Sequence, residues 1–227
     1  ILEEVGVLIH SPEVARLLTS CGARASKDGK RTLISEDLVK EAMKAAPKSV
    51  LLASRDGKAD IRIPQEDRMF VCNGGEGVHV TDMLAGTERP STLRDLEGFV
   101  RILDALPQVD FCWGMVGALD MPVKLKGLNE LKAAFENTTK HFQGGANDSS
   151  EAQNMVELAV IVTGGKDNLA KRPVFSSVHC PNSPHTFETG LAEAQVEFAR
   201  FGIPVVAMAA AVAGLTSPVT LSGTISQ

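Results

Sequence analysis

Four apolar runs decide the fold of this chain: VDFCWGMVGA (109–118), KHFQGG (140–145), PVFSSVH (173–179) and PVVAMAAAVAG (204–214). They begin about 31 residues apart, and helix-patterned segments fill the three intervals between them. Parallel strands need a crossover connection, and a strand–helix–strand unit has about this length. The repeat therefore predicts a parallel α/β protein, and a (β/α)8 TIM-type barrel suits the spacing best.

The same repeat suggests that the chain holds only part of such a barrel. Met69–Asn73 is typical of one more strand, so about five of the expected eight strands are present. The opening residues ILEEVGV contain no Met and begin inside an amphipathic pattern, which favours a truncated start. We therefore expect the first part of an incomplete barrel over residues 69–227.

Residues 1–68 differ from the repeat that follows them. Ser11 and Ser35 each precede a helix-patterned segment, as N-cap residues do. Asp-Gly pairs at 28–29 and 56–57 separate short extended segments and indicate hairpins. This pattern predicts an α+β accessory region in front of the barrel.

Polar caps also mark helices inside the repeat. A strand at 78–82 is followed by a helix that we expect to begin at Ser91 or Thr92. Asp148, with Glu151 three residues later, resembles an N-cap pair at the start of another helix.

Composition and charge limit the class of protein. The chain has 227 residues, of which 44% are hydrophobic, enough to bury a sizeable core. A net charge of −5 without a basic stripe argues against nucleic acid as a partner. No run of 18 apolar residues occurs, so we expect no membrane span. The four cysteines lie far apart with no CxxC pair, as is typical of reduced thiols in a cytoplasmic protein: Cys21, Cys72, Cys112 and Cys180.

In a barrel the functional groups lie where each strand gives way to its loop. The loops at these positions are rich in small and amide residues, and glycines there would let a ligand approach the backbone closely. The candidate binding residues at the successive strand ends are Asn73, Glu76, Trp113, Asp120, Gln143, Gly144, His179 and Ser183.

Several familiar sites fit the residues poorly. Gly74–Gly77 is followed by a strand and by no Gly-Lys-Ser/Thr, so a tight turn is favoured over a phosphate loop. His179 and Cys180 with His185 lack a fourth ligand, and we expect no metal there. Lys140 could suggest a Schiff base, but it lies at the amino end of its strand, which favours a solvated lysine.

Two of the candidate binding residues, Trp113 and Asp120, each have two possible roles. Trp113, the sole Trp of the chain, either packs in the core or forms an aromatic wall for a ligand, such as a cation. Asp120 either caps a helix or turn, or contacts a ligand. No catalytic residue can be assigned, because spacing alone gives neither a Ser-His-Asp order nor a carboxylate pair.

The order of segments along nearly the whole chain resembles the trimethylamine methyltransferase family. Single pieces such as LDMP are uninformative alone, and the series in order carries the resemblance. The similar stretches are ILEEVGVLIHSPEVARLLTSCGA (1–23), LISEDLVKEAMKAAP (33–47), ASRDG (53–57), NGGEGVHVTDMLAGTERPSTLRDL (73–96), LDMP (119–122), NTTKHFQGG (137–145) and AGLTSPVTLSGTISQ (213–227).

The resemblance implies a barrel enzyme that passes a methyl group from a methylated amine to the Co(I) of a separate corrinoid protein. The amine would be a quaternary amine such as glycine betaine, or trimethylamine, and this chain would bind no cofactor directly. Glu76, Trp113 and Asp120 become candidates for holding the cation. Family members that use trimethylamine carry a pyrrolysine in a later part of their chain, beyond Gln227.

We therefore expect the isolated chain to be inactive and the full-length enzyme to be a homo-oligomer with a corrinoid protein as partner. Two other functions stay open. One is a different barrel enzyme of the lyase or aldolase type, and the other is a barrel that binds small cations without turnover.

Overall fold

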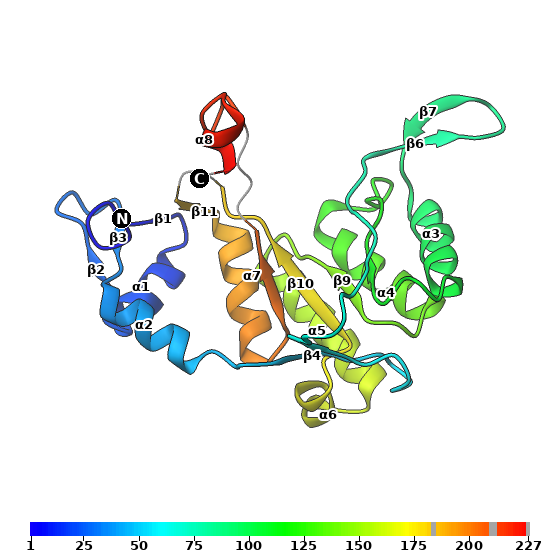
Figure 1. The fold of residues 1–227 in the computed structure, drawn as a ribbon, viewed down its shortest axis with the longest axis horizontal. Coiled ribbons are helices and arrows are strands. Elements are labelled where there is room, and N and C mark those ends of the chain that lie inside the picture. The colour runs from blue at the N-terminus through cyan, green and yellow to red at the C-terminus, as the bar shows by residue number, and fades with distance from the viewer. Residues whose placement is uncertain (183–184, 209–212, 226–227) are drawn as a thin grey trace.

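A four-stranded parallel sheet lies at the centre of the molecule (Figure 1). The computed structural model describes residues 1–182, 185–208 and 213–225. The sheet has the order β12-β10-β9-β8, and the bounds are β8 (Cys112–Trp113), β9 (Phe142–Gly144), β10 (Phe175–His179) and β12 (Val205–Ala207). All four apolar runs thus form neighbouring parallel strands, which confirms the prediction of a parallel α/β protein.

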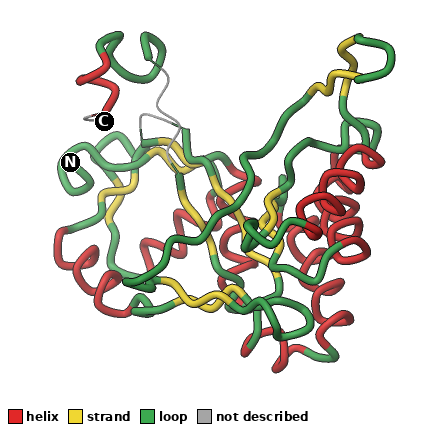
Figure 2. Tube along the Cα trace, turned by 45° about the vertical axis from the view of Figure 1, so that its right-hand side comes forward, coloured by secondary structure: helices red, strands yellow, loops and turns green. Residues whose placement is uncertain are grey.

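The helices of the repeat form a layer against this sheet (Figure 2). Their contacts follow chain order, because α3 packs on α4, α4 on α5, and α5 on both α6 and α7. The core lies between the layers, where the Phe175 ring meets the Phe198 ring edge to face at 5.7 Å. The helices are α3 (Leu93–Ala105), the short 3-10 helix η1 (Val123–Leu125), α4 (Lys126–Asn137), α5 (Ser149–Thr163), α6 (Lys166–Lys171) and α7 (Thr189–Arg200).

The expected barrel is seen only in part. Over the described ranges the parallel sheet is open, with β8 and β12 at its edges, and no closed barrel is formed. The observed fold is therefore a mixed α/β structure with a parallel sheet.

The fifth predicted strand is wrong, because Met69–Asn73 forms no strand. This segment lies beside the start of the β8 run, and Val71 O accepts a 2.8 Å hydrogen bond from Asp110 N. Two backbone N–H groups that would donate to backbone carbonyls in a β-ladder donate to side-chain oxygens here. Val71 N donates to Asp110 Oδ2, and Trp113 N donates to Asn73 Oδ1. A parallel bridge forms only later, between Gly77 and Val116.

The N-terminal residues form the predicted short helices and hairpins. Ser11 caps α1 and Ser35 caps α2 through side-chain hydrogen bonds, and both Asp-Gly turns join antiparallel strands. The division of the chain at residue 68 stays a prediction. The elements are β1 (Leu8–Ile9), α1 (Pro12–Ser20), β2 (Arg24–Ala25), β3 (Thr32–Leu33), α2 (Glu36–Ala45), β4 (Val50–Leu52) and β5 (Ile61–Ile63).

Two further connections tie this region to the parallel sheet. β1 pairs in parallel with β11 (Thr186–Phe187), which lies directly before α7. The loop between β4 and β5 packs against the start of β10, because Ala53 N donates to Pro173 O and Arg172 forms two hydrogen bonds with Asp60. These bonds fix the amino ends of the strands, opposite to the ends where a site is expected.

The predicted strand at 78–82 is present as β6 (His79–Asp82), and it pairs with an unpredicted strand, β7 (Thr87–Pro90). Together they form a hairpin that projects from the body of the molecule (Figure 1). Thr92 then caps α3, as expected. The described part of the chain ends with α8 (Leu221–Ile225).

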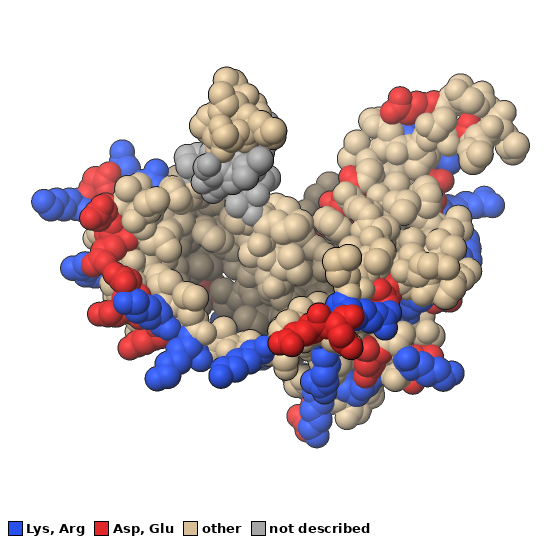
Figure 3. Space-filling model, in the orientation of Figure 1, with Lys and Arg blue, Asp and Glu red and all other residues tan. Residues whose placement is uncertain are grey.

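Acidic and basic side chains alternate along the lower margin of the face shown in Figure 3, and the centre of this face is free of both. In the described ranges, each helix is too short or too polar to cross a lipid bilayer.

Candidate functional site

A cavity of about 350 Å³ lies at the carboxyl ends of β8, β9 and β10. Trp113 closes one side, and Gly145–Asn147 and Val178 belong to the two neighbouring strand ends. The remaining wall comes from segments outside the sheet and from the residue after β10: Gly75, Glu76, Lys126, Gly127, Cys180 and Leu191. This is the edge of a parallel sheet at which ligands bind in α/β proteins, and we take it as the candidate site.

The position of Trp113 is fixed by two residues of the preceding loop. Asn73 Nδ2 donates to Trp113 O at 2.7 Å, and Trp113 N donates to Asn73 Oδ1 at 2.9 Å. Gly75 lies so close that a Cβ there would be 2.9 Å from two carbons of the indole ring and 2.6 Å from Gly114 O. Only glycine allows this approach, so the loop and the indole form one packed unit beside the cavity.

Lys126 brings a positive charge to the cavity wall and is paired with Glu130. Their Nζ and Oε1 atoms are 2.9 Å apart, and Glu130 Oε1 also accepts a 2.7 Å hydrogen bond from Ala118 N. Burial raises the pKa of the Glu130 carboxyl more than these two donors lower it. Burial lowers the pKa of Lys126, but Glu130, Glu76 and Glu151 outweigh it, and the net shift is upward. Lys126 therefore stays protonated near neutral pH.

A second buried carboxylate joins two segments of the wall. Glu151 is 1% exposed and accepts three hydrogen bonds, which come from Gly127 N at 2.6 Å, Asn147 N at 2.8 Å and Asn147 Nδ2 at 2.9 Å. The first donor lies in the first turn of α4 and the other two belong to the loop after β9. A carboxylate with three N–H donors is well satisfied in a buried position.

The structure brings three of the predicted residues together, since Glu76 and Trp113 line the cavity and Asn73 holds Trp113. Gln143 and Gly144 lie within β9 and outside the wall. Gln143 Oε1 accepts a long 3.5 Å hydrogen bond from Ser176 Oγ, which is also 3.0 Å from His141 Nε2. Gln143 thus belongs to a buried polar group further from the strand ends.

Asp120 and His179 are not among the residues that line the cavity. Asp120 Oδ1 accepts a 2.8 Å hydrogen bond from Leu93 N and so contacts the start of α3, as the helix-cap interpretation expects. His179 is 2% exposed and stacks on Phe187, with the ring centroids 5.5 Å apart. Burial lowers its pKa, and neither ring nitrogen has a hydrogen-bond partner among the described residues. Ser183 lies outside the described residues.

The structure also decides between the interpretations of Lys140. Lys140 Nζ donates to Leu103 O and to Leu106 O at 2.7 and 2.8 Å. It therefore binds the carbonyls at the end of α3, so neither a Schiff base nor a solvated lysine describes it. In the described residues no group of three or more His, Cys, Asp and Glu side chains could hold a metal ion.

Sequence reasoning missed four residues that shape the site: Gly75, Lys126, Glu130 and Glu151. A signal existed for the pair, because Lys126 and Glu130 are four residues apart and meet on one face of α4. For Gly75 and Glu151 the decisive contacts join distant parts of the chain, and spacing along the sequence cannot reveal them.

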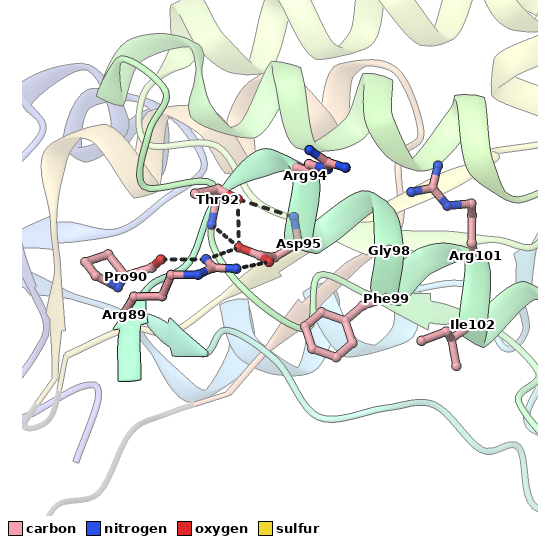
Figure 4. A pocket seen from close by; sticks show the side chains of 9 residues that line it. All are labelled: Arg89, Pro90, Thr92, Arg94, Asp95, Gly98, Phe99, Arg101 and Ile102. Atoms are coloured by element: carbon pink, nitrogen blue, oxygen red, sulfur yellow. Dashed lines mark hydrogen bonds and ion pairs between the residues drawn. The ribbon is translucent and has the colours of Figure 1, made fainter. Parts of the chain in front are cut away.

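A second cavity, of about 690 Å³, lies on the outer side of α3 (Figure 4). One of the lining residues is Asp95, whose carboxylate accepts two hydrogen bonds from Arg89 and two from Thr92. Figure 4 shows Phe99 and Ile102 on the opposite side of the helix from Arg94. These contacts fix a hairpin to a helix start, and this cavity shares no lining residue with the cavity at the strand ends.

Comparisons with known proteins agree with the resemblance. A family model described as trimethylamine methyltransferase (MTTB) matches residues 1–227. The trimethylamine methyltransferase MttB of Desulfitobacterium hafniense (strain DSM 10664 / DCB-2) is 33% identical over 225 residues, which cover 99% of this chain and 45% of that protein.

Two more relatives show the spread of names among similar proteins. The glycine betaine methyltransferase of Desulfitobacterium hafniense (strain Y51) is 28% identical over 227 residues, covering 100% of this chain and 47% of that protein. The trimethylamine methyltransferase MttB of Methanosarcina barkeri is 26% identical over 229 aligned positions, which cover 99% of this chain and 46% of that protein. The chain therefore spans a little under half the length of these relatives.

Proposed function

The chain belongs to the trimethylamine methyltransferase family, and on this basis we propose that it moves a methyl group from a methylated amine to the corrinoid cobalt of a partner protein. The observation that supports this most is the cavity at the strand ends, where the indole of Trp113 and the carboxylate of Glu76 share one wall. Because the chain spans under half of its relatives, the proposal concerns the enzyme of which it forms part.

The charges around the cavity suit a cationic methyl donor. Three carboxylates, of Glu76, Glu130 and Glu151, interact with a single ammonium group, that of Lys126. The site is therefore formally negative when its side chains have their usual charges. An indole face attracts a quaternary ammonium ion, and this attraction is stronger where water is excluded. Trp113 and Glu76 would thus replace part of the hydration shell that the cation loses.

Methyl transfer from a quaternary amine requires mainly that the site orient the substrate. The corrinoid of the partner supplies the nucleophile that takes the methyl carbon. A quaternary ammonium already has a neutral tertiary amine as its leaving group, so this chain's residues need only desolvate the cation and align one methyl group. Rigid walls serve this purpose, and Asn73, Gly75 and Glu151 make the walls rigid.

We also propose that the open sheet is the first part of a (β/α)8 barrel. The strands follow one another in chain order, as in a barrel, and the candidate cavity lies at their carboxyl ends. His141, Gln143 and Ser176 form a polar group on one face of the sheet, and in a complete barrel this face would be the interior. Residues 1–68 would then be the accessory region.

A transfer assay tests the function. The full-length enzyme is mixed with its corrinoid protein in the Co(I) state and with glycine betaine, choline or trimethylamine, and the cobalt absorption spectrum is followed. We expect a methyl-cobalt spectrum with at least one amine, and a loss of activity of about tenfold or more in Trp113→Leu.

Two other outcomes would contradict the proposal. Binding of an amine without methyl-cobalt formation would favour a cation-binding protein. A lysine adduct trapped by borohydride with a carbonyl substrate would favour a lyase or aldolase.

A further inference from the structure

We propose that two copies of this chain pack against each other about a two-fold axis at the outer side of α5, in the groove between α5 and α7. This inference goes beyond the proposed function and does not depend on it. It starts from a helix whose last turns leave apolar side chains exposed beside an apolar groove.

The last turns of α5 are apolar on every side of the helix. The run LAVIV (158–162) goes more than once round the helix axis, and of its residues only Ala159 is buried. Ile161 is 77% exposed. A helix that is apolar all round is normally buried, so this end of α5 has the composition of a covered surface.

Ile161 is part of a continuous groove and is not an isolated surface residue. The groove has a volume of about 470 Å³ and lies between α5, the end of α7 and the start of α6. Scattered exposed apolar residues are common on proteins, whereas a contiguous apolar patch with a polar rim is typical of an interaction surface. The apolar part of this groove consists of Val156, Val160, Ile161 and Phe201.

Later strands of the proposed barrel would not cover this groove. α5 joins β9 to β10, which are the two inner strands of the sheet, and it already has α4 on one side and α7 on the other. Strands that continue the sheet would join it at the edges formed by β8 and β12, so their helices would lie beyond α3 or α7. We therefore look for the occupant of the groove in another molecule.

The rim of the groove carries charges of both signs that can pair with a partner. Glu157 is exposed and, in the described part of the chain, its carboxylate forms no hydrogen bond or ion pair. Lys166 places Nζ 5.6 Å from the centroid of the Phe201 ring and has no carboxylate partner among the described residues. Glu197, the third charged residue of the rim, is already paired with Arg200.

The arrangement of these charges makes the surface complementary to itself, as a two-fold interface requires. Glu157 comes four residues before Ile161 and Lys166 comes five residues after it. If two antiparallel α5 helices meet with Ile161 near the axis, Glu157 of each copy faces Lys166 of the other. A parallel arrangement would instead place like charges opposite each other, which is unfavourable. An apolar centre surrounded by charged residues is also the usual anatomy of a protein interface.

The oligomeric state of the full-length protein tests this surface. Analytical ultracentrifugation gives its molar mass as it is diluted from about 100 µM to about 0.1 µM, and we expect a dimer or an assembly built from dimers. Ile161→Asp places a charge at the apolar centre and should raise the dissociation constant of the dimer about 100-fold or more. Ile102→Asp, at an exposed isoleucine of α3, is the matched control and should leave the mass unchanged. Circular dichroism and urea unfolding check that both variants fold.

Charge reversal tests the pairing itself. Glu157→Lys and Lys166→Glu each set like charges opposite each other at both pairs, so each variant alone should dimerise about tenfold more weakly. In an equal mixture of the two variants, opposite charges face each other again, and a mixed dimer should form with nearly the affinity of the unaltered protein. A tag on one variant allows the other to be captured with it. Reversal is needed because Glu157→Gln would remove only a pair that solvent screens, which has little effect.

Four results would overturn the inference. The full-length protein could be monomeric at about 100 µM, or its assembly could have the same mass in Ile161→Asp, so that it forms through another surface. Ile161→Asp could lose stability to urea without a change in mass, which would show that a later segment of the same chain covers the groove. The two charge variants could also stay apart when mixed. None of these results bears on methyl transfer, which the cobalt spectrum measures separately.

Discussion

The backbone N–H of Gly127 donates a 2.6 Å hydrogen bond to the buried carboxylate of Glu151, which joins the start of α4 to the first turn of α5. The other oxygen of the same carboxylate binds Asn147 in the loop after β9. Two segments of the cavity wall thus depend on one side chain, although 24 residues separate Gly127 from Glu151.

Glu151→Gln should destabilise the protein and loosen the wall. The amide keeps one acceptor oxygen and presents an NH2 group to donors, so at least one of the N–H groups of Gly127 and Asn147 loses its partner. Leaving a buried donor unsatisfied costs about 1–3 kcal/mol of unfolding free energy. Urea unfolding measures this loss. Glu157→Gln, on the exposed side of the same helix, should stay within about 0.5 kcal/mol of the unaltered chain, and an equal effect in both would contradict the prediction.

Gly75→Ala should displace the indole of Trp113. The new methyl group would come within 2.9 Å of the ring and 2.6 Å of Gly114 O, distances at which either the loop or the ring must shift. Because Trp113 is the sole Trp of the chain, its fluorescence reports the shift directly, as a change in emission wavelength and in quenching by iodide. Gly74→Ala is the matched control, since a Cβ there meets nothing within 4 Å. Identical spectra for the two variants would refute the close approach.

His141 should make the stability of the protein depend on pH. It is fully buried, with Nδ1 3.2 Å from Ala53 O and Nε2 3.0 Å from Ser176 Oγ, and burial lowers its pKa to about 4. In the unfolded chain its pKa is near 6.5, so the unfolded state binds the proton first as the pH falls. The neutral histidine thus contributes stability that is complete above pH 6.5 and is lost between pH 6.5 and 4, by up to about 3 kcal/mol.

The measurement is the unfolding free energy at several pH values between 7 and 4.5, for the unaltered chain and for His141→Gln. Subtracting the two curves removes the contribution of the carboxylates. We expect the difference in stability to shrink as the pH falls. A difference that is constant over this range would show that His141 is not a buried neutral group.

Arg89 should fasten the β6–β7 hairpin to the start of α3. It forms two hydrogen bonds, at 2.7 and 2.8 Å, with Asp95, whose pKa lies well below its usual range mainly because of this pairing. Arg89 is partly exposed, so solvent screens the pair, and Arg89→Met should change the overall stability little. Hydrogen exchange of amides in residues 79–90 should nevertheless quicken. Arg94→Met, on the same helix, serves as the control, and equal exchange in the two variants would argue against the fastening role.

The repeat made the parallel sheet predictable, because strand and helix periods are properties of short segments. VDFCWGMVGA, KHFQGG, PVFSSVH and PVVAMAAAVAG each have the residue pattern of a strand, and their spacing dictates the crossovers. Caps were predictable for the same reason, since Ser11, Ser35, Thr92 and Asp148 each accept a hydrogen bond from an N–H group three residues away.

Contacts between distant segments were not predictable in this way. Met69–Asn73 has the residues of a strand, but the side chains of Asp110 and Asn73 take the hydrogen bonds that a ladder would need. Asp148 and Glu151 begin α5 as expected, but the Glu151 carboxylate also joins the start of α4 to the loop after β9, which the sequence did not reveal. The expectation that functional residues lie at the carboxyl ends of the strands identified Trp113 and Glu76 correctly as cavity residues. This expectation cannot tell which residue of a strand end faces the cavity. For that reason it also included Asp120 and His179.

Glu76→Gln should weaken the binding of a methylated amine in a manner that depends on salt. Glu76 is exposed on the cavity wall, and no hydrogen bond or ion pair of the described residues occupies its carboxylate. Its attraction for a cation acts partly through solvent, so we expect a loss of about three- to tenfold in affinity at low ionic strength. At about 0.5 M salt the unaltered and variant proteins should differ by less than twofold. Quenching of Trp113 fluorescence by glycine betaine or choline provides the titration. Glu88→Gln, on the projecting hairpin, changes the net charge equally and should leave the affinity unchanged at both salt concentrations. If the two variants respond alike, the effect belongs to the overall charge of the protein, and Glu76 has no special place beside the indole.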